Sequence, residues 1–250
     1  EGSASSSAIT GFGNSQGSSG RLHLDIDSSG IYVADRQLDN VKKLDFSGNV
    51  LFTITSNISD ARDIAVFQQN IYVSDSNSIK KFSSSGNYLG VFASVSNSKN
   101  IGIDSNGNVY VGSGTGNYVY IFNSAGNQIN AVAVNSFASS SPLAVEPNGT
   151  FYISNKKTPT DQTFVVRKYS SSGSFQNYIG TPDEHSAPYS IGAHNGKVYV
   201  GQHNGQRISI FDTNGNLEKI IDSPSSDGLD YALDAFGSPS DVALDSTGNI

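Results

Sequence analysis

Short apolar segments recur along the chain, and each contains a tyrosine flanked by other strand-forming residues. The segments are IYVAD at 31–35, IYVSD at 71–75, VYVGS at 109–113, FYISN at 151–155 and VYVGQ at 198–202. Their tyrosines lie 38 to 47 residues apart, and a period of this size is typical of stacked supersecondary units. The pattern therefore predicts a repeat protein.

Three further short strands accompany each tyrosine segment. The preceding strands are LDID at 24–27, IAVF at 64–67, IGID at 101–104, LAVE at 143–146, IGAH at 191–194 and VALD at 242–245. A third strand is followed by a turn glycine at Gly48, Gly86, Gly126, Gly173 and Gly215, where tight hairpins need a positive φ. Fourth strands follow, such as VLFTI at 50–54 and YLGVF at 88–92. Each unit is thus predicted to be a four-stranded antiparallel sheet.

The first two strands of each unit are apolar on both faces, whereas later strands carry pairs such as Lys42-Lys43 and Lys80-Lys81. A strand that is apolar on both faces must be covered on both. Sheets stacked radially around an axis meet this requirement, so the sequence predicts an all-β fold, a β-propeller. A β-sandwich or an open β-solenoid explains the four-strand unit less well, and no stretch has a sustained helical period.

Counting first strands predicts six blades in a single domain over residues 1–250. The predicted blades span 21–57, 58–95, 96–135, 136–182 and 183–222, and a sixth combines 237–250 with 5–13. In that sixth blade AITGFG at 8–13 resembles a fourth strand, and VALD precedes a turn. The sixth blade is therefore expected to be built from both termini, to be incomplete in this sequence, and to continue beyond Ile250 in the natural protein.

Composition narrows the range of partners. The chain has 22 acidic and 15 basic residues and a net charge of −7, which disfavours binding to nucleic acid or anionic lipid. It has no cysteine, and it contains no apolar run long enough to span a membrane. The chain begins at Glu1, contains no methionine and is rich in serine and asparagine. These features favour a processed, secreted protein at an extracellular or cell-surface location.

The repeated pattern resembles the NHL-repeat family. The resemblance is carried by SPSDVALDSTGNI at 238–250, by IYVAD at 31–35, and by strands that end in an aromatic residue followed by SGN or NGN. It implies a propeller fold, in a family that includes protein-binding and RNA-binding modules, receptor sensor domains and a zinc-dependent amidating lyase. The arginine usual at the start of the third strand is matched only by Arg207; the other repeats have Asn40, Ser78, Tyr118 and Val165.

The residues predict no catalytic constellation. A zinc lyase of this fold would need three converging histidines, and the chain has His23, His185, His194 and His203. His23 begins a first strand and His194 ends one, and opposite ends of a strand differ by about 10 Å in height. The glycine-rich GSGTGN at 112–117 opens no helix and is expected to be a loop. The protein is therefore not expected to be an enzyme.

A ring of mostly polar residues is predicted at one mouth of the central channel, where the innermost strands begin. Its members are His23, Asp63, Asn100, Pro142, Ser190 and Asp241. Two positions further along, Asp25 stands where the other repeats have alanine or glycine, and a buried acid needs a partner. One hypothesis is that His23, Asp25, Asp63 and Asp241 bind Ca²⁺ or a cationic ligand group. The alternative is that they are solvated channel residues.

Loops and turns supply the remaining candidates. The sequons at Asn57 and Asn148 fall in predicted turns and are possible glycosylation sites, although an asparagine- and serine-rich chain also produces sequons by chance. Insertions at 156–163 and 222–237 are long for a propeller, and long loops on a rigid scaffold often carry recognition. Tyr231 and Phe236 are expected to provide contact area in the second insertion.

The preferred function is an extracellular recognition or scaffold domain that binds protein or glycan through a propeller face and its loops. One alternative is a structural subunit of a surface layer or extracellular filament, formed by self-assembly. Another is a metal-dependent lyase or lactonase on the same fold.

Overall fold

The computed structural model describes residues 11–12, 22–134, 141–156, 163–185, 188–202, 205–222 and 241–244. These residues form β-strands, turns and one short 3₁₀ helix, η1 (Pro182–Glu184), with no α-helix in the described ranges. None of them forms a helix long and apolar enough to cross a membrane.

The strands form five four-stranded sheets, and in each sheet consecutive strands pair antiparallel. The first two sheets comprise β1 (Leu22–Asp27), β2 (Gly30–Asp35), β3 (Asn40–Leu44), β4 (Val50–Ile54), β5 (Ala61–Phe67), β6 (Asn70–Asp75), β7 (Ser78–Ser83) and β8 (Tyr88–Ser94). The third and fourth comprise β9 (Ser98–Ile103), β10 (Val109–Ser113), β11 (Tyr118–Phe122), β12 (Gln128–Ala133), β13 (Leu143–Val145), β14 (Phe151–Lys156), β15 (Phe164–Tyr169) and β16 (Phe175–Ile179). The fifth comprises β17 (Pro188–His194), β18 (Lys197–Gln202), β19 (Arg207–Asp212) and β20 (Leu217–Asp222).

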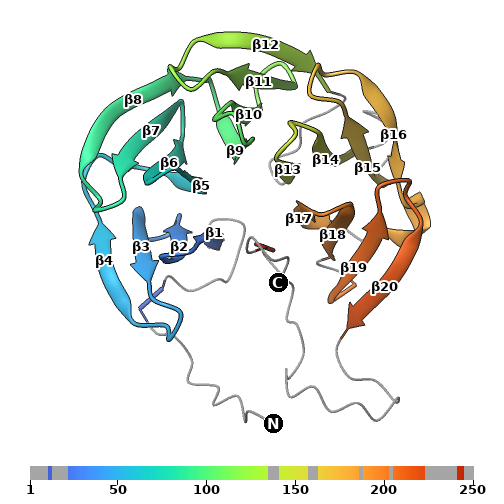
Figure 1. Ribbon diagram of the computed structural model, residues 1–250, viewed down its shortest axis with the longest axis horizontal. Coiled ribbons are helices and arrows are strands. Elements are labelled where there is room, and N and C mark those ends of the chain that lie inside the picture. The colour runs from blue at the N-terminus through green and yellow to red at the C-terminus, as the bar shows by residue number, and fades with distance from the viewer. Residues whose placement is uncertain are drawn as a thin grey trace.

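Figure 1 shows these sheets standing side by side around a common axis, with β1, β5, β9, β13 and β17 nearest to it. The last strand of each sheet lies on the perimeter. This arrangement is a β-propeller with four-stranded antiparallel blades, as the sequence pattern predicts.

The hydrophobic core lies between neighbouring blades rather than inside any one of them. The repeated tyrosines Tyr32, Tyr110 and Tyr152 are at most 1% exposed. In one cluster Tyr32 of the first blade packs with Ile64 of the second, and similar clusters join each following pair. The second strands need two apolar faces because each faces a neighbouring blade on both sides.

Turn glycines also hold the blades together. Gly126, in the turn before β12, has φ of +84°, and an added Cβ there would lie 2.5 Å from the Phe92 carbonyl oxygen on β8. Glycine is therefore required both by the turn conformation and by the close approach of the neighbouring blade.

The predicted sixth blade is wrong, because the described residues form five blades. At the sixth position the structure describes only residues 241–244, which belong to no strand. Asp241 accepts a hydrogen bond from the Leu24 N–H at 2.8 Å, and Val242 packs against Tyr199 and Ile208 of the fifth blade. The segment thus lies between the first and fifth blades.

A first-strand sequence becomes part of a blade only when a second strand pairs along it, and no described strand pairs with VALD. Of AITGFG, only residues 11–12 are described.

Candidate functional site

The innermost strands and residues 241–244 line a central cavity of about 190 Å³. Most of its wall is small or aliphatic, including Ala65, Gly102, Ala144, Gly192 and Ala243. These are the small residues that the sequence pattern places at the axis, where the strands converge. The polar side chains are concentrated on one side of the cavity.

The predicted ring of polar residues is largely brought together. His23, Asp63, Asn100, Pro142 and Asp241 all line the cavity. Ser190 does not: its hydroxyl is buried without a hydrogen-bond partner, and it faces Gly201 of β18. Tyr189 lines the cavity instead. The register irregularity between Pro188 and Ser190 does not account for this difference, because β5 has the same irregularity between Ala61 and Asp63, and Asp63 lines the cavity.

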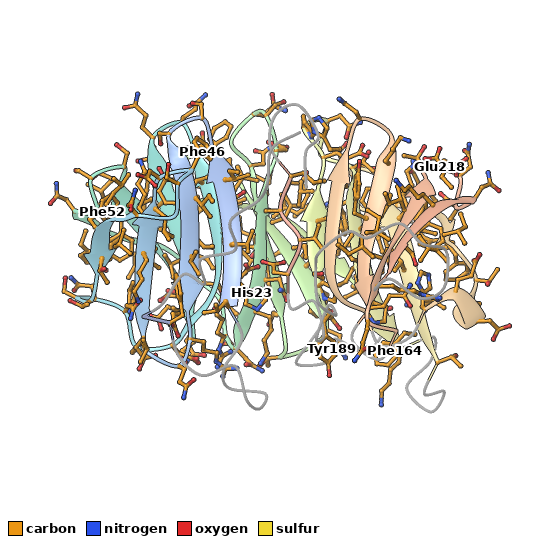
Figure 2. All side chains as sticks on the ribbon, turned by 90° about the horizontal axis from the view of Figure 1, so that it is seen from below. His23, Phe46, Phe52, Phe164, Tyr189 and Glu218 are labelled. Atoms are coloured by element: carbon orange, nitrogen blue, oxygen red, sulfur yellow. The ribbon has the colours of Figure 1, made fainter. Side chains whose placement is uncertain are left out.

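His23 lies between two carboxylates from different parts of the chain. Its Nδ1 is 3.5 Å from Oδ1 of Asp63 and 3.6 Å from Oδ2 of Asp241. His23 is 9% exposed and Asp63 is 7% exposed. Figure 2 shows His23 between the two sides of the ring, toward the face on which Tyr189 lies. One imidazole and two carboxylates therefore meet at one channel mouth.

The carboxylates also join neighbouring inner strands through backbone hydrogen bonds. Asp63 on β5 accepts the N–H of Ile64 at 2.8 Å and that of Ile101 on β9 at 2.9 Å. Asp241 accepts the N–H of its neighbour Val242 at 2.9 Å as well as that of Leu24 on β1. Each carboxylate thus accepts one N–H from its own segment and one from the next strand around the ring.

Asp25 makes the same kind of bridge. This bridge accounts for an acid at a position where the other repeats have alanine or glycine. Its two oxygens accept the N–H of Ile26 at 2.8 Å and that of Val66 on β5 at 2.7 Å. Asp25 is not part of the compact group formed by His23, Asp63 and Asp241. The partner that a buried acid requires is here the backbone of two strands.

Burial has the largest effect on the pKa values of these acids. Desolvation raises the pKa of Asp25 to about 6, although its two backbone hydrogen bonds act in the opposite direction. Desolvation also raises the pKa of Asp63, and the nearby charge of Asp241 raises it further. The pKa of Asp241 is raised in the same way, chiefly by burial. The protein thus favours the protonated forms of these carboxyls more than water does.

The three-residue group has donor atoms suited to a metal ion. The ligand atoms of His23, Asp63 and Asp241 all lie within 4.8 Å of one another. Each carboxylate oxygen that accepts an N–H retains a second lone pair. An imidazole nitrogen beside carboxylates suits zinc or a similar transition metal better than calcium, which prefers oxygen ligands alone. The donor set fits such an ion.

The structure places His185 and His194 away from this site. His185 is the buried residue that follows η1, with Nε2 2.7 Å from the Ile179 carbonyl oxygen, and burial lowers its pKa. His194 ends β17 and does not line the cavity. His203 lies outside the described residues, as do Tyr231 and Phe236.

Both predicted glycosylation asparagines are exposed in turns. Asn57 has a positive φ of 61°. The Oδ1 of Asn148 accepts the N–H of Thr150 at 2.8 Å. Attachment of a glycan to either residue stays a prediction.

The sequence pattern alone did not identify the outer strands as a candidate binding surface. The perimeter strands β4, β8, β12 and β16 contain no charged residue. Their exposed apolar side chains are Val50, Leu51, Tyr88, Leu89, Val91, Ile129, Phe175 and Tyr178. Figure 2 shows Phe52 of β4 at this perimeter. The absence of charge on β4, β8, β12 and β16 is visible in the sequence and indicates an unusual surface, because edge strands are normally protected by charged side chains.

Comparison with known proteins supports the fold and leaves the family open. No family model matches the chain, and no curated protein matches it. Among solved structures, hydrazine synthase from Kuenenia stuttgartiensis aligns with a TM-score of 0.63 and 13% identity over 93% of each chain. A chain from a nidogen/laminin complex gives 0.67 and 12%, covering 80% of this chain and 79% of that one. Virginiamycin B lyase from Staphylococcus aureus gives 0.62 and 13%, covering 84% and 72%. At these identities the similarity establishes the propeller fold alone.

Proposed function

We propose that this propeller, of the NHL-like type, is an extracellular or cell-surface recognition and scaffold domain that binds another protein along its perimeter. The observation that carries the proposal is the row of uncharged outer strands with exposed apolar side chains. An outer strand also presents unpaired backbone N–H and C=O groups, to which an extended segment of another protein can add. The perimeter therefore offers backbone hydrogen bonding and apolar contact together.

β8 is the strand on which the proposal is most easily tested. Leu89 and Val91 are 56% and 55% exposed, among the largest exposures of any apolar side chain on the perimeter. Exposed apolar groups on a protein surface mark interaction sites when they cluster. By contrast, β20 carries Glu218 and Lys219, so one outer strand of the same protein has the usual protection.

Two further considerations support the proposal. One structural neighbour comes from a complex named for nidogen and laminin, so a propeller of similar fold is found in a protein assembly. The low content of charged residues, 15%, suits an extracellular protein whose polar surface is largely uncharged. Both considerations motivate the test, which has to be made on this chain.

The test uses the immobilised chain and surface proteins released from the cells that produce it. We expect one protein to be retained in an amount comparable to the immobilised chain. The double variant Leu89→Lys, Val91→Lys should reduce this retention at least about tenfold, because pairing would bury two charges. The matched control Asn214→Lys adds a charge on an exposed turn of the fifth blade and should retain the wild-type amount.

Equal retention by the wild type and the double variant, or no retained protein, would overturn the proposal. If the retained protein is the chain itself, the result favours the alternative of a surface-layer or filament subunit. Whether the retained protein is a different protein or a second copy of this chain, hydrogen exchange of the complex should show protection of the β8 amides.

A second candidate function is metal-dependent catalysis at the channel mouth, and it is favoured by the group His23, Asp63 and Asp241. Two structural neighbours are named as virginiamycin B lyase and streptogramin B lyase. In such a site His23 and the two carboxylates would hold the ion, and the ion would polarise a substrate oxygen.

Metal analysis distinguishes this candidate. Zinc or manganese bound at the site should raise the midpoint of thermal unfolding of wild-type protein, because a ligand stabilises the state that binds it. His23→Gln removes the imidazole and leaves every carboxylate bridge intact, so it should abolish the rise. Absence of stoichiometric metal, together with no thermal shift, would eliminate this function.

A further inference from the structure

A second cavity, of about 330 Å³, opens between the third and fourth blades. Its lining residues are Asp104, Asn106, Asn108, Tyr110, Ile121, Ile129, Asn130, Asn148 and Ser171. They come from the β9–β10 turn, from β10 to β12, and from two turns of the fourth blade. Four of the nine are asparagines. We refer to this cavity as the asparagine cleft.

Aromatic side chains fill the corresponding space between the earlier blades. Phe52 on β4 lies against Gly86 of the second blade, where an added Cβ would be 3.2 Å from its ring. The residue at the position of Phe52 in the third blade is Asn130, because Phe52 pairs with Lys43 and Asn130 pairs with Ile121 at the same place in their sheets. The first blade thus has an aromatic ring at this position, the second blade has Gly90, and the third has a short carboxamide.

A second ring, that of Phe67, fills the gap between the second and third blades only. Asp27, Asp104 and Glu146 hold the same position in the first, third and fourth blades. Phe67, at the end of β5, lies against Gly107 of the third blade, with an added Cβ 3.1 Å from its ring. Both Phe67 and Asp104 stand two residues after the inner-strand residue that pairs with the repeated tyrosine. The Asp104 carboxylate accepts hydrogen bonds from within the third blade. It also lies beside the fourth blade, where an added Cβ at Gly149 would be 3.3 Å from its Oδ2.

The cleft also lacks the lysine that the third strand has in the first, second and fourth blades; the fifth blade has Ile210 at this position. Lys43 and Lys81 place their Nζ 4.8 and 5.2 Å from the ring centroids of Tyr32 and Tyr72. Lys168 occupies the same position in the fourth blade, and Ile121 occupies it in the third. No lysine or arginine is among the lining residues.

Asp104 is the one ionisable acid among the described lining residues. Asp104 is 3% exposed, and its oxygens accept the N–H groups of Asn106 and Asn108, the Asn108 side-chain amide and the Tyr110 hydroxyl. Its capacity to accept a hydrogen bond is therefore largely used within the protein. A charged ligand would find neither an available acid nor a base in this cleft.

We propose that the asparagine cleft binds a short neutral saccharide. Asn130 donates one N–H to the Ser172 carbonyl oxygen and accepts the Ala131 N–H, and the Oδ1 of Asn148 accepts the Thr150 N–H. A carboxamide has two N–H groups and two oxygen lone pairs, so after these bonds it still has a donor and an acceptor close together, as a sugar hydroxyl has. Ile129, which is 55% exposed at the rim, offers apolar surface to the C–H face of a sugar ring. The volume is at the lower end of the range for small-molecule sites, which suits one or two sugar units. The cleft shares Ile129 of β12 with the perimeter surface proposed for protein binding, whereas β8, on which that proposal is tested, contributes no lining residue.

The experiment uses bacterially expressed chain with ¹⁵N-labelled asparagine, so that Asn148 carries no glycan. The probes are N-acetylglucosamine, its β1,4-linked dimer and maltose, each titrated into the millimolar range. We expect the side-chain amide signals of Asn106, Asn130 and Asn148 to shift with at least one of them. Asn130→Phe restores the residue of the first blade and should weaken that binding at least about tenfold.

Two further variants make the test decisive. Asn177→Phe introduces the same ring at the same sheet position in the fourth blade, outside the cleft, and should bind as the wild type does. Ile121→Lys introduces the lysine of the first, second and fourth blades and should also weaken binding. It serves in place of Asn130→Phe if that variant fails to fold.

Absence of shifts with all three saccharides would overturn the proposal, and so would equal shifts in Asn130→Phe. If neutral tetrapeptides shift these signals and saccharides do not, the cleft is a peptide site and the saccharide assignment fails. The double variant Leu89→Lys, Val91→Lys should retain saccharide binding, so failure at the perimeter and failure at the cleft remain distinguishable.

Discussion

The inner strands β1 and β5 are joined to their neighbours by carboxylates, whereas β9, β13 and β17 approach theirs through small side chains. On the first side Asp25, Asp63 and Asp241 each accept an N–H from the next strand around the ring. On the second side the positions equivalent to Asp63 hold Asn100, Pro142 and Ser190, and no such carboxylate bridge occurs among the residues described there.

Close packing takes the place of the bridges on the neutral side. An added Cβ at Gly102 would lie 2.6 Å from Cγ2 of Val145 on β13, and one at Gly192 would lie 3.0 Å from Cδ1 of Leu244. Repeats with one backbone geometry thus close around the axis by two different interactions. On one side of the channel, the carboxylates of the polar ring hold neighbouring inner strands together. The candidate ligand site lies on that same side.

Removal of one bridge should give the largest effect. Asp63→Ala leaves the N–H groups of Ile64 and Ile101 without their acceptor, and two buried unsatisfied donors cost about 4 kcal/mol of unfolding free energy. The control Asn100→Ala, at the equivalent position of the neutral side, should cost less than about 1 kcal/mol. Urea unfolding of both variants measures the difference. Equal losses would contradict the distinction between the two sides.

The acid side should also make stability depend on pH. The pKa of Asp25 is about 6 in the folded protein and 3.8 as a free group, so the folded state binds the proton more tightly than the unfolded state. Stability is therefore highest where Asp25 is protonated in the folded state, and it falls as pH rises from about 4 through about 6. The shift corresponds to about 3 kcal/mol, and Asp63 and Asp241 act in the same direction.

The measurement compares urea midpoints at about pH 5 and about pH 8. It is best made in His23→Gln, because His23 faces Asp63 and Asp241 and histidines titrate in the same range. Asp25→Ala should narrow the difference between the two midpoints. A midpoint that rises toward pH 8 would show that backbone hydrogen bonds outweigh desolvation at these carboxyls.

Overpacking of the neutral side should give the smallest effect. Gly102→Ala forces the side chain of Val145 to move and should cost about 1 to 2 kcal/mol. The acid side already has alanine at the equivalent position, Ala65, which shows that a Cβ is accommodated there. Urea unfolding measures the loss, and a stability equal to that of the wild type would show that β9 and β13 are not held by close contact.

Much of the fold could be predicted from local pattern. Tyr32, Tyr72 and Tyr110 mark strands that are buried on both faces, and this property implies radial stacking of sheets. The sixth blade was predicted wrongly because VALD has the sequence of an inner strand, whereas strand identity depends on a pairing partner. The polar ring was predicted from the same alignment, and it failed only at Ser190, whose hydroxyl faces Gly201 of β18 and does not line the channel.

The roles of the site residues depend on contacts that sequence spacing does not contain. Asp25 was recognised as unusual, but its two N–H partners lie on β1 and β5 and follow from the angle between blades. The asparagine cleft likewise depends on residues distant in sequence, such as Asn130 and Asn148, which line the same gap only after the third and fourth blades pack together.

The amino-acid sequence by itself determined the strands, their order within each sheet and their stacking around an axis, because these follow from apolar periodicity and nearby turn residues. Tertiary structure alone decided which acids meet and which spaces stay open. The hydrogen bond from the Leu24 N–H to Asp241 joins residues 217 positions apart. Such a contact forms only when β1 and residues 241–244 are brought together around the ring, and no local pattern encodes that geometry.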